Sequence, residues 1–332
     1  MISVLIPLYN DAPTLARALR SVQRQTVTDW ECVVADDGST DEGPAVAARF
    51  SAADPRFRLL CLPHRGIVAA LNDGVDACRG HYVARMDADD VCHPERLAAQ
   101  RDAMERHPEV ALASCLLRKY PCADLRVGMQ RYEGWLNSVI TPEEHARDIY
   151  VESPLAHPTA FLRRETLEAL GGYHDPPWPE DYDLWLRIHQ SGGRIAKVPR
   201  FLFFWQERSG RLSRVSERYG PDAFRRCKVS YLMMGPLRGH VEVIVWGAGS
   251  NGKPMACALV EAGLRIRAFV DIDPRKVGQR IGDAPVVGPA DVPSMRGVPI
   301  LAAVGKDGAR EEVRAALRSL NFTEGRDFWC VC

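Results

Sequence analysis

Acidic residues follow two apolar runs in the amino-terminal part of the chain. Asp87 and Asp89 lie one residue apart after one run, and Asp36 and Asp37 lie side by side after another. Carboxylates at such spacings can hold Mg²⁺ or Mn²⁺ against phosphate oxygens, because these cations prefer oxygen ligands. A solvated acidic turn is the alternative for each motif, since Asp, Gly and Ser also form tight turns. Two such motifs at neighbouring strand ends favour a cation-dependent site.

The elements expected around these residues are strands and helices in alternation. Apolar runs with β-branched residues predict strands at 3–8, 32–35, 58–62 and 81–86. Helix-like segments at 66–78 and 182–190 carry apolar residues at helical spacing. This alternation predicts an α/β fold with a mostly parallel sheet flanked by helices, which binds ligands beyond the carboxyl ends of its strands.

A second α/β segment begins near residue 241 with its own glycine motif. Gly247, Gly249 and Gly252 follow an apolar strand and open a helix, and Asp271 ends the next strand. In such a turn, backbone amides bind phosphate at the helix amino terminus, and the acidic residue binds a ribose hydroxyl. The pattern predicts a Rossmann-like domain that holds NAD or a nucleotide-sugar. Only one mononucleotide half is present, so an appended docking module is the favoured alternative.

The composition restricts the classes of partner. The chain has 43 Lys and Arg residues against 43 Asp and Glu residues, and its formal net charge is zero. A protein that binds nucleic acid through phosphates has a basic excess, so no nucleic-acid partner is expected. No apolar stretch reaches the ~18 residues of a membrane span, and the amino terminus lacks the basic region of a signal peptide. We expect a cytoplasmic protein, which leaves peripheral membrane association open.

The ten cysteines are predicted to be reduced core thiols. No Cys-x-x-Cys pair occurs, and Cys32, Cys61 and Cys115 lie inside apolar runs, where a thiol acts as a small buried hydrophobe.

Five short motifs in order resemble those of the family 2 glycosyltransferases of the GT-A fold. They are Pro7–Asn10, Asp36–Asp41, Asn72-x-Gly74, Arg85–Asp90 and Glu180–Trp185. The resemblance covers residues 1–207 and implies a GT-A nucleotide-diphospho-sugar transferase domain there. Residues 208–238 are then a connector with a helix, and residues 239–332 form the smaller Rossmann-like domain.

The resemblance also implies a donor site and a cation. Asp36 would accept a hydrogen bond from the nucleobase of a nucleotide-sugar, most readily a UDP-sugar, and Asp87 would reach the ribose or the metal. Asp89 would hold Mn²⁺ or Mg²⁺ against the diphosphate. The residues implied to contact the nucleotide are Pro7, Tyr9, Asn10, Asp11, Asp36, Asp37, Arg65 and Asp87.

Asp181 occupies the position of the family's general base, and Glu180 is the second candidate. A base there would deprotonate an acceptor hydroxyl and give inversion at the sugar. Capping of the following helix is the alternative role, because a helix amino terminus attracts carboxylates. The third metal ligand is left among His157, Glu207 and water. Trp178, Tyr182 and Trp185 could form an aromatic platform for the acceptor, although Trp185 fits the core better.

Three arginines, Arg208, Arg211 and Arg214, follow the proposed catalytic region. They would either close over the diphosphate or lie in a solvated connector.

The sequence therefore predicts a metal-dependent, inverting glycosyltransferase that acts on a hydroxyl of a glycan, a lipid-linked glycan or a small molecule. One alternative is a NAD-binding oxidoreductase or sugar-modifying protein that works through the carboxyl-terminal domain. Another is a non-catalytic scaffold that binds nucleotide-sugars. The paired motifs around Asp89 and Asp181 favour the transferase.

Overall fold

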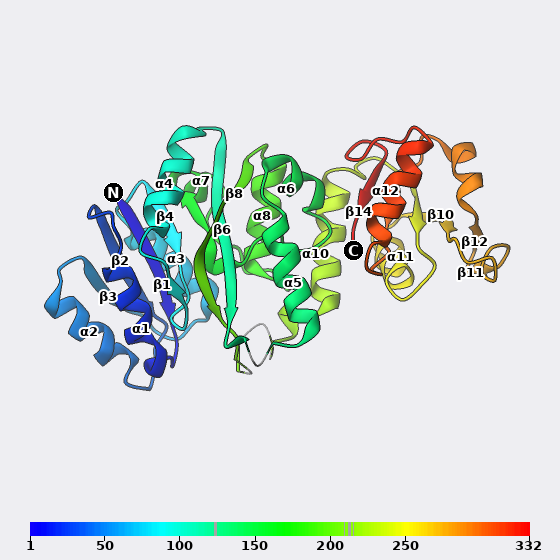
Figure 1. Cartoon of the computed structure of the whole chain (residues 1–332). Helices are drawn as coiled ribbons and strands as arrows, with labels where there is room; N and C mark the ends of the chain where they lie inside the picture. The colour runs from blue at the N-terminus through cyan, green and yellow to red at the C-terminus, as the bar shows by residue number, and fades with distance from the viewer. Residues whose placement is uncertain (123–124, 209, 212–213, 215) are drawn as a thin grey trace. The chain divides into compact units, whose positions relative to one another are not determined.

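The computed structural model describes residues 1–122, 125–208, 210–211, 214 and 216–332. The chain divides into two compact units, and Figure 1 labels most of their helices and strands. The first comprises Met1–Ala146, Pro154–Pro176 and Glu180–Val215, and the second Arg147–Ser153, Pro177–Pro179 and Ser216–Cys332. Ser209, Leu212, Ser213 and Val215 of the expected connector lie outside the described residues.

The first unit is built on a mixed sheet of eight strands in the order β3-β2-β1-β4-β7-β6-β8-β5. The strands β3, β2, β1 and β4 run parallel, whereas β7 is antiparallel to both of its neighbours and β5 is antiparallel to β8. Their bounds are β1 (Ile2–Leu8), β2 (Trp30–Asp36), β3 (Phe57–Cys61), β4 (Tyr82–Arg85), β5 (Val91–Cys92), β6 (Val110–Tyr120), β7 (Phe161–Arg163) and β8 (Arg194–Gln206). The expected α/β fold and the four expected strands are confirmed.

The helices of this unit follow from local patterns. In α1 the apolar residues Leu15, Leu19 and Val22 recur at helical spacing and are buried against the sheet. The helices are α1 (Ala12–Gln23), α2 (Gly43–Ala53), α3 (Ile67–Ala77), α4 (Arg96–Arg106), α5 (Val127–Ser138), α6 (Pro142–Asp148), η2 (His157–Thr159), α7 (Arg164–Ala169) and α8 (Glu180–Gln190). Within the described ranges, no helix of either unit combines the length and apolarity needed to cross a bilayer.

The cysteines are all free thiols, and most are buried. Cys32 and Cys115 lie in the core as expected. Cys61 is an exception, because its side chain is exposed. It ends β3, which is the edge strand of the sheet, so no neighbouring strand covers that side of it.

The second unit contains a sheet of six strands in the order β11-β12-β10-β9-β13-β14. All adjacent pairs are parallel except β11 with β12. The strands are β9 (Glu242–Trp246), β10 (Arg265–Val270), β11 (Arg280–Ile281), β12 (Ala284–Val287), β13 (Ile300–Ala302) and β14 (Phe328–Cys330). The helices are η3 (Glu217–Tyr219), α10 (Pro221–Met234), α11 (Gly252–Glu261), η4 (Pro289–Met295) and α12 (Ala309–Ser319). That this unit is a Rossmann-like nucleotide-binding domain stays a prediction.

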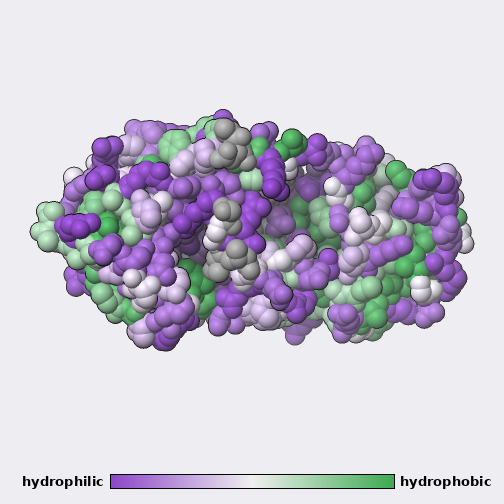
Figure 2. Space-filling view, turned by 90° about the horizontal axis from the view of Figure 1, so that it is seen from below, coloured by the Kyte–Doolittle hydropathy of each residue, from purple (hydrophilic) through white to green (hydrophobic). Residues whose placement is uncertain are grey.

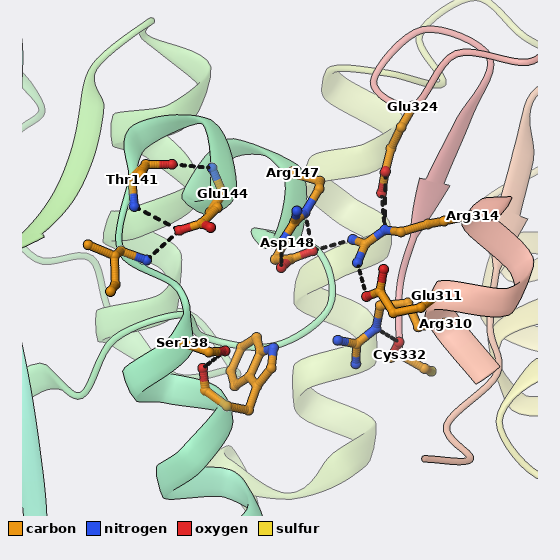
Figure 3. Close-up of polar contacts among 12 residues, drawn as sticks. Ser138, Thr141, Glu144, Arg147, Asp148, Arg310, Glu311, Arg314, Glu324 and Cys332 are labelled. Atoms are coloured by element: carbon orange, nitrogen blue, oxygen red, sulfur yellow. Dashed lines mark hydrogen bonds and ion pairs between the residues drawn. The ribbon is translucent and has the colours of Figure 1, made fainter. Parts of the chain in front are cut away.

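A buried arginine of α12 organises the polar contacts of the second unit (Figure 3). The Arg314 side chain is 2% exposed, and its Nε lies 2.9 Å from Glu324 Oε1 and its Nη1 2.7 Å from Glu311 Oε1. Its Nη2 pairs with Asp148, which also binds the Arg147 guanidinium. The short segment 147–153 is therefore joined to residues near the end of the chain.

Candidate active site

The loops that follow β1 and β2 meet at one edge of the first unit's sheet. β1 pairs in parallel with both β2 and β4, so the carboxyl ends of the three strands are adjacent. Asn10 joins two of the loops. Its backbone amide donates to Ser39 Oγ at 2.9 Å, and its side-chain Oδ1 accepts from the backbone amide of Thr40 at 2.8 Å. Figure 2 looks from below, the side on which β1 ends in Figure 1, and hydrophilic residues are frequent on this face.

The predicted nucleotide-contacting residues differ in accessibility. Pro7 is buried within β1, whereas the Tyr9 side chain is 47% exposed and stacks on His64 with ring centroids 4.3 Å apart. Asp36 is buried, and its Oδ1 accepts from the Ser39 amide at 3.2 Å. Tyr9 and Asp36 are thus an aromatic surface and a buried acceptor on adjacent strand ends.

Asp37 and Arg65 serve local structure. The Asp37 carboxylate accepts from the amides of Arg65 and Gly66 at 2.8 and 2.9 Å, just before α3 begins. The Arg65 guanidinium forms an ion pair with Asp73 of α3. In this structure both residues shape the turn that leads into α3.

Three carboxylates gather immediately after β4. Oxygens of Asp87, Asp89 and Asp90 lie within 4.8 Å of one another. Burial and the negative charge of Asp87 raise the pKa of Asp89 to about 6 and hold the pKa of Asp90 well above its usual range. Asp90 Oδ1 accepts from the Gln206 amide at 2.7 Å, whereas its buried Oδ2 has no hydrogen-bond partner among the described residues. A hard divalent cation fits these oxygen donors and would relieve their repulsion.

Asp90 belongs to the expected acidic motif, but it was not predicted as a metal ligand. The signal was present, because it is the third acid of the run Asp87–Asp90. Its side chain adds a third carboxylate to the two that were expected.

Arginines face the acidic cluster from two elements. The buried Arg85 of β4 forms an ion pair with Asp87. From the segment after β8, Arg208 Nε lies 2.8 Å from Asp89 Oδ2, and Arg208 also pairs with Asp11. Arg211 Nη2 lies 3.5 Å from Asp87 Oδ2. The interpretation of these two arginines as a solvated connector is wrong, because they neutralise buried or half-buried carboxylates.

Neither His157 nor Glu207 belongs to the acidic cluster that could hold a cation. Glu207 is 11% exposed and pairs with Arg214 at 2.6 Å and with Lys119 at 3.4 Å. His157 Nε2 lies 3.0 Å from Tyr173 Oη, and its Nδ1 lies 3.8 Å from Glu180 Oε1. Burial holds the pKa of His157 well below its usual range. The expectation that His157 is a metal ligand is not met, since its ring is turned toward the start of α8.

The candidate bases occupy the first turn of α8. Burial and the adjacent Glu180 raise the pKa of Asp181 to about 7. Glu180 is buried and faces His157, whereas Asp181 is half-buried. Tyr182 and Trp185 are fully buried, which confirms Trp185 as a core residue and removes Tyr182 from the expected aromatic platform.

Asn72 was named only as part of a motif, and the structure gives it a definite role. Its Nδ2 donates to the Tyr173 carbonyl and its Oδ1 accepts from the Tyr173 amide, both at 2.8 Å. Because Tyr173 Oη contacts His157, α3 helps to position the groups around the candidate base.

The glycine motif and Asp271 belong to the second unit. Gly247 has a φ of +119°, and a Cβ there would lie 2.8 Å from the Ala303 carbonyl oxygen; a Cβ on Gly252 would collide with the Gly247 carbonyl oxygen. Around Gly249 there is open space. Asp271 Oδ2 accepts from the Ala248 amide at 3.0 Å and pairs with Lys276 at 2.8 Å, contacts that help to lower its pKa. Close packing therefore explains Gly247 and Gly252, and internal polar contacts explain Asp271, without the need for a bound ligand.

Comparison with known proteins identifies relatives of the first part of the chain. The family model described as "Glycosyl transferase family 2" matches residues 3–171. The chain is similar to the amylovoran biosynthesis glycosyltransferase AmsE of Erwinia amylovora, with 35% identity over 205 residues, 61% of this chain and 74% of that protein. It is also similar to the putative glycosyltransferase EpsE of Bacillus subtilis, with 29% identity, covering 67% of this chain and 78% of that one.

Solved structures share the fold. The mannosyltransferase PcManGT from Pyrobaculum calidifontis, in complex with GDP-Man and Mn²⁺, aligns with a TM-score of 0.51 and 24% identity. That alignment covers 70% of this chain and 61% of the mannosyltransferase chain. TarS 1–349 of S. aureus, in complex with UDP-GlcNAc, aligns with a TM-score of 0.56 and 17% identity, covering 78% of this chain and 70% of the TarS chain.

Proposed function

The chain belongs to glycosyl transferase family 2 and is a glycosyltransferase, and from this we propose that it moves a sugar from a UDP-linked donor to a hydroxyl in a cation-dependent, inverting reaction. The observation that carries the proposal is that the first unit contains both a cluster of carboxylates and a separate carboxylate with a raised pKa. The cluster, in which Asp89 and Asp90 are buried and Asp87 is half-buried, follows β4, and the half-buried Asp181 with its raised pKa lies in the first turn of α8.

The donor's nucleobase is proposed to lie against Tyr9 and Asp36. The exposed Tyr9 ring, stacked on His64, offers an aromatic face to a base. Asp36 Oδ1 accepts from the Ser39 amide, and among the described residues no hydrogen bond occupies Oδ2, which is therefore an acceptor for one N–H of the base. Uracil presents one ring N–H, and that number of donors supports a UDP-sugar. The solved TarS complex with UDP-GlcNAc is compatible with this choice.

The cation is proposed to be held by Asp87 and Asp89, with Asp90 as the third carboxylate of the cluster. When bound, Mn²⁺ or Mg²⁺ would stabilise the negative charge that develops on the departing diphosphate. The aspartates would hold the cation just after β4, where the buried Arg85 pairs with Asp87.

Asp181 is proposed as the general base that takes the proton of the acceptor hydroxyl. A base works best when its pKa lies near the operating pH, and the pKa of Asp181 is raised to about 7. Attack from the face opposite the leaving diphosphate inverts the sugar. Relatives named for amylovoran and succinoglycan biosynthesis support a glycan or lipid-linked glycan as acceptor, and through it a role in polysaccharide synthesis.

Release of free nucleotide from a panel of nucleotide-sugars, with and without Mn²⁺, tests this function. We expect UDP release that needs the cation and is lost in Asp89→Asn. Asp76→Asn, which changes an exposed acid of α3, serves as the matched control and should leave the rate unchanged. Release that persists in chelator, or that is equal in Asp89→Asn, would contradict the cation's proposed role.

The alternative of a NAD-dependent oxidoreductase is not favoured, because the family membership concerns sugar transfer. For the second unit we keep the proposal of an appended Rossmann-like module. Its parallel strands and the open space at Gly249 support it. Protection of the glycine turn from hydrogen exchange by NAD or a nucleotide-sugar would test the module's ligand.

A further inference from the structure

Two arginines form ion pairs with the carboxylates that are proposed to hold the cation. Arg208 Nε lies 2.8 Å from Asp89 Oδ2, and the same guanidinium pairs with Asp11. Arg211 Nη2 lies 3.5 Å from Asp87 Oδ2. These two residues therefore place two positive charges against the carboxylates that are proposed to hold a divalent cation.

The two positive charges and the cation would compete. A divalent cation adds two charges to the acidic cluster, and like charges at contact distance repel strongly where water is partly excluded. Both arginines follow β8, outside the sheet, and their side chains are partly exposed, 37% for Arg208 and 12% for Arg211. Arg85 differs, because it is buried in β4 beside the same carboxylates and has no such freedom.

The two arginines differ in the partners that would remain without the aspartates. The Arg211 guanidinium lies 4.5 Å from the Trp205 ring centroid, and its Nη1 donates to the Gln206 carbonyl at 2.7 Å. Arg208 is 37% exposed and is held mainly by carboxylates. Loss of the ion pair with Asp87 would thus leave Arg211 close by, while Arg208 would be free to turn.

We propose that Arg208 and Arg211 bind the diphosphate of the donor. In the donor-free protein they neutralise Asp89 and Asp87, as the bound cation would. With a cation held by Asp87 and Asp89, both guanidinium groups would separate from these aspartates. The guanidinium groups would then donate charge-assisted hydrogen bonds to the diphosphate, whose oxygens match the planar fork of arginine. This inference rests on the proposed function and adds an exchange of charges between this chain's arginines and the cation.

The exchange predicts opposite effects on two affinities. With the full chain, binding of Mn²⁺ alone is measured by electron paramagnetic resonance, and binding of UDP at saturating Mn²⁺ by calorimetry. In Arg208→Ala we expect Mn²⁺ alone to bind several-fold more tightly, because a competing charge is gone. UDP with Mn²⁺ should bind ~10-fold or more weakly, because a charge-assisted hydrogen bond to phosphate is lost. Arg211→Ala should show the same pair of changes.

Arg214→Ala is the matched control. Arg214 lies in the same segment, but its Nη2 binds Glu207 Oε1 at 2.6 Å and it has no ion pair with the acidic cluster among the described contacts. Both affinities should stay at the wild-type value in this variant.

The outcomes separate the exchange from a merely structural role. If both affinities fall together in Arg208→Ala and Arg211→Ala, the arginines only support the segment, and the proposal is overturned. Unchanged affinities also overturn it. If Asp89→Asn binds Mn²⁺ as tightly as the wild type, the cation site of the proposed function is itself wrong, which is a different result from failure of the exchange.

Discussion

At the scale of single residues, two adjacent acids at the start of α8 have different surroundings. Glu180 is buried and faces His157, whereas Asp181 is half-buried and its Oδ1 accepts from the Tyr182 amide at 2.7 Å. Only a group that the acceptor can reach is able to take its proton. The different exposure of the two side chains therefore favours Asp181 as the base.

The first prediction concerns the size of this contribution. Asp181→Asn should lower kcat by about 10²–10⁴, the usual value of a positioned base, while UDP affinity in Mn²⁺ stays close to that of the wild type. Steady-state kinetics and calorimetry provide the two measurements. Glu180→Gln is the paired control, with a smaller effect expected. The opposite order, with Glu180→Gln inactive and Asp181→Asn active, would assign the base to Glu180.

The second prediction is a pH dependence. Because a base acts only when deprotonated, kcat should rise with pH and level off above the Asp181 pKa of about 7. Stability should change in the other direction. The pKa of Asp181 in the folded protein lies above its value of about 3.9 in the unfolded chain. The stabilisation by this carboxyl is therefore complete below the unfolded pKa and is lost as the pH rises through the folded pKa of about 7.

Thermal unfolding of Asp181→Asn tests the stability part of that prediction. The variant lacks the ionisable group, so its melting temperature relative to the wild type should be higher at pH 8 than at pH 4. A difference in melting temperature that does not change with pH would show that the pKa of the Asp181 carboxyl is not raised in the folded protein.

At the scale of elements, α3 connects the donor side of the site with the base. Its first residues follow the turn organised by Asp37, and Gly74 allows it to pack closely on Leu5 of β1. From the same helix, Asn72 makes two hydrogen bonds to the backbone of Tyr173. One helix thus fixes the position of a segment about a hundred residues further along the chain.

The third prediction concerns this connection. Asn72→Ala leaves the Tyr173 amide and carbonyl without their partner, and an unsatisfied group of this kind costs about 1–3 kcal/mol. Urea unfolding should show that loss, together with a lower kcat, because Tyr173 contacts His157 beside the bases. Asp76→Ala, at an exposed position of the same helix, is the control and should change neither quantity. An unchanged kcat in Asn72→Ala would show that α3 does not position the groups around the base.

At the scale of the whole molecule, the compact units do not follow the order of the chain. The segment 147–153 precedes much of the first unit, yet it belongs to the second, where Asp148 meets Arg314. Lys228 of α10 adds to this arrangement, because its Nζ donates to the carbonyls of Val151 and Val331. Contacts between distant parts of the sequence therefore hold the second unit together (Figure 3).

The fourth prediction follows from the burial of Arg314. Arg314→Met removes a charge that is 2% exposed and leaves Asp148 with Arg147 as its remaining ion-pair partner. Removal of one partner from a buried ion pair costs about 3–5 kcal/mol, and we expect the lower end because Arg147 remains. Urea unfolding measures the change. Arg318→Ala, whose side chain is 58% exposed, should cost far less; equal costs would contradict the central role of Arg314.

The sequence by itself determined the alternation of strands and helices and the acidic residues at the strand ends. It also determined that Asp181 lies at the amino-terminal end of a helix. These features depend on the spacing of neighbouring residues, and such spacing can be read along the chain. The strands expected at 3–8 and 32–35 and the helix expected at 66–78 are present for that reason.

Tertiary structure alone decided which charged side chains meet. It placed His157 beside Tyr173 and Glu180 rather than with the acidic cluster, and it brought Arg208 to Asp89. It also joined Asp148 to Arg314, which are 166 positions apart. No local pattern marks such partners, because an ion pair depends on where the chain returns in space and on how much water the surrounding packing excludes.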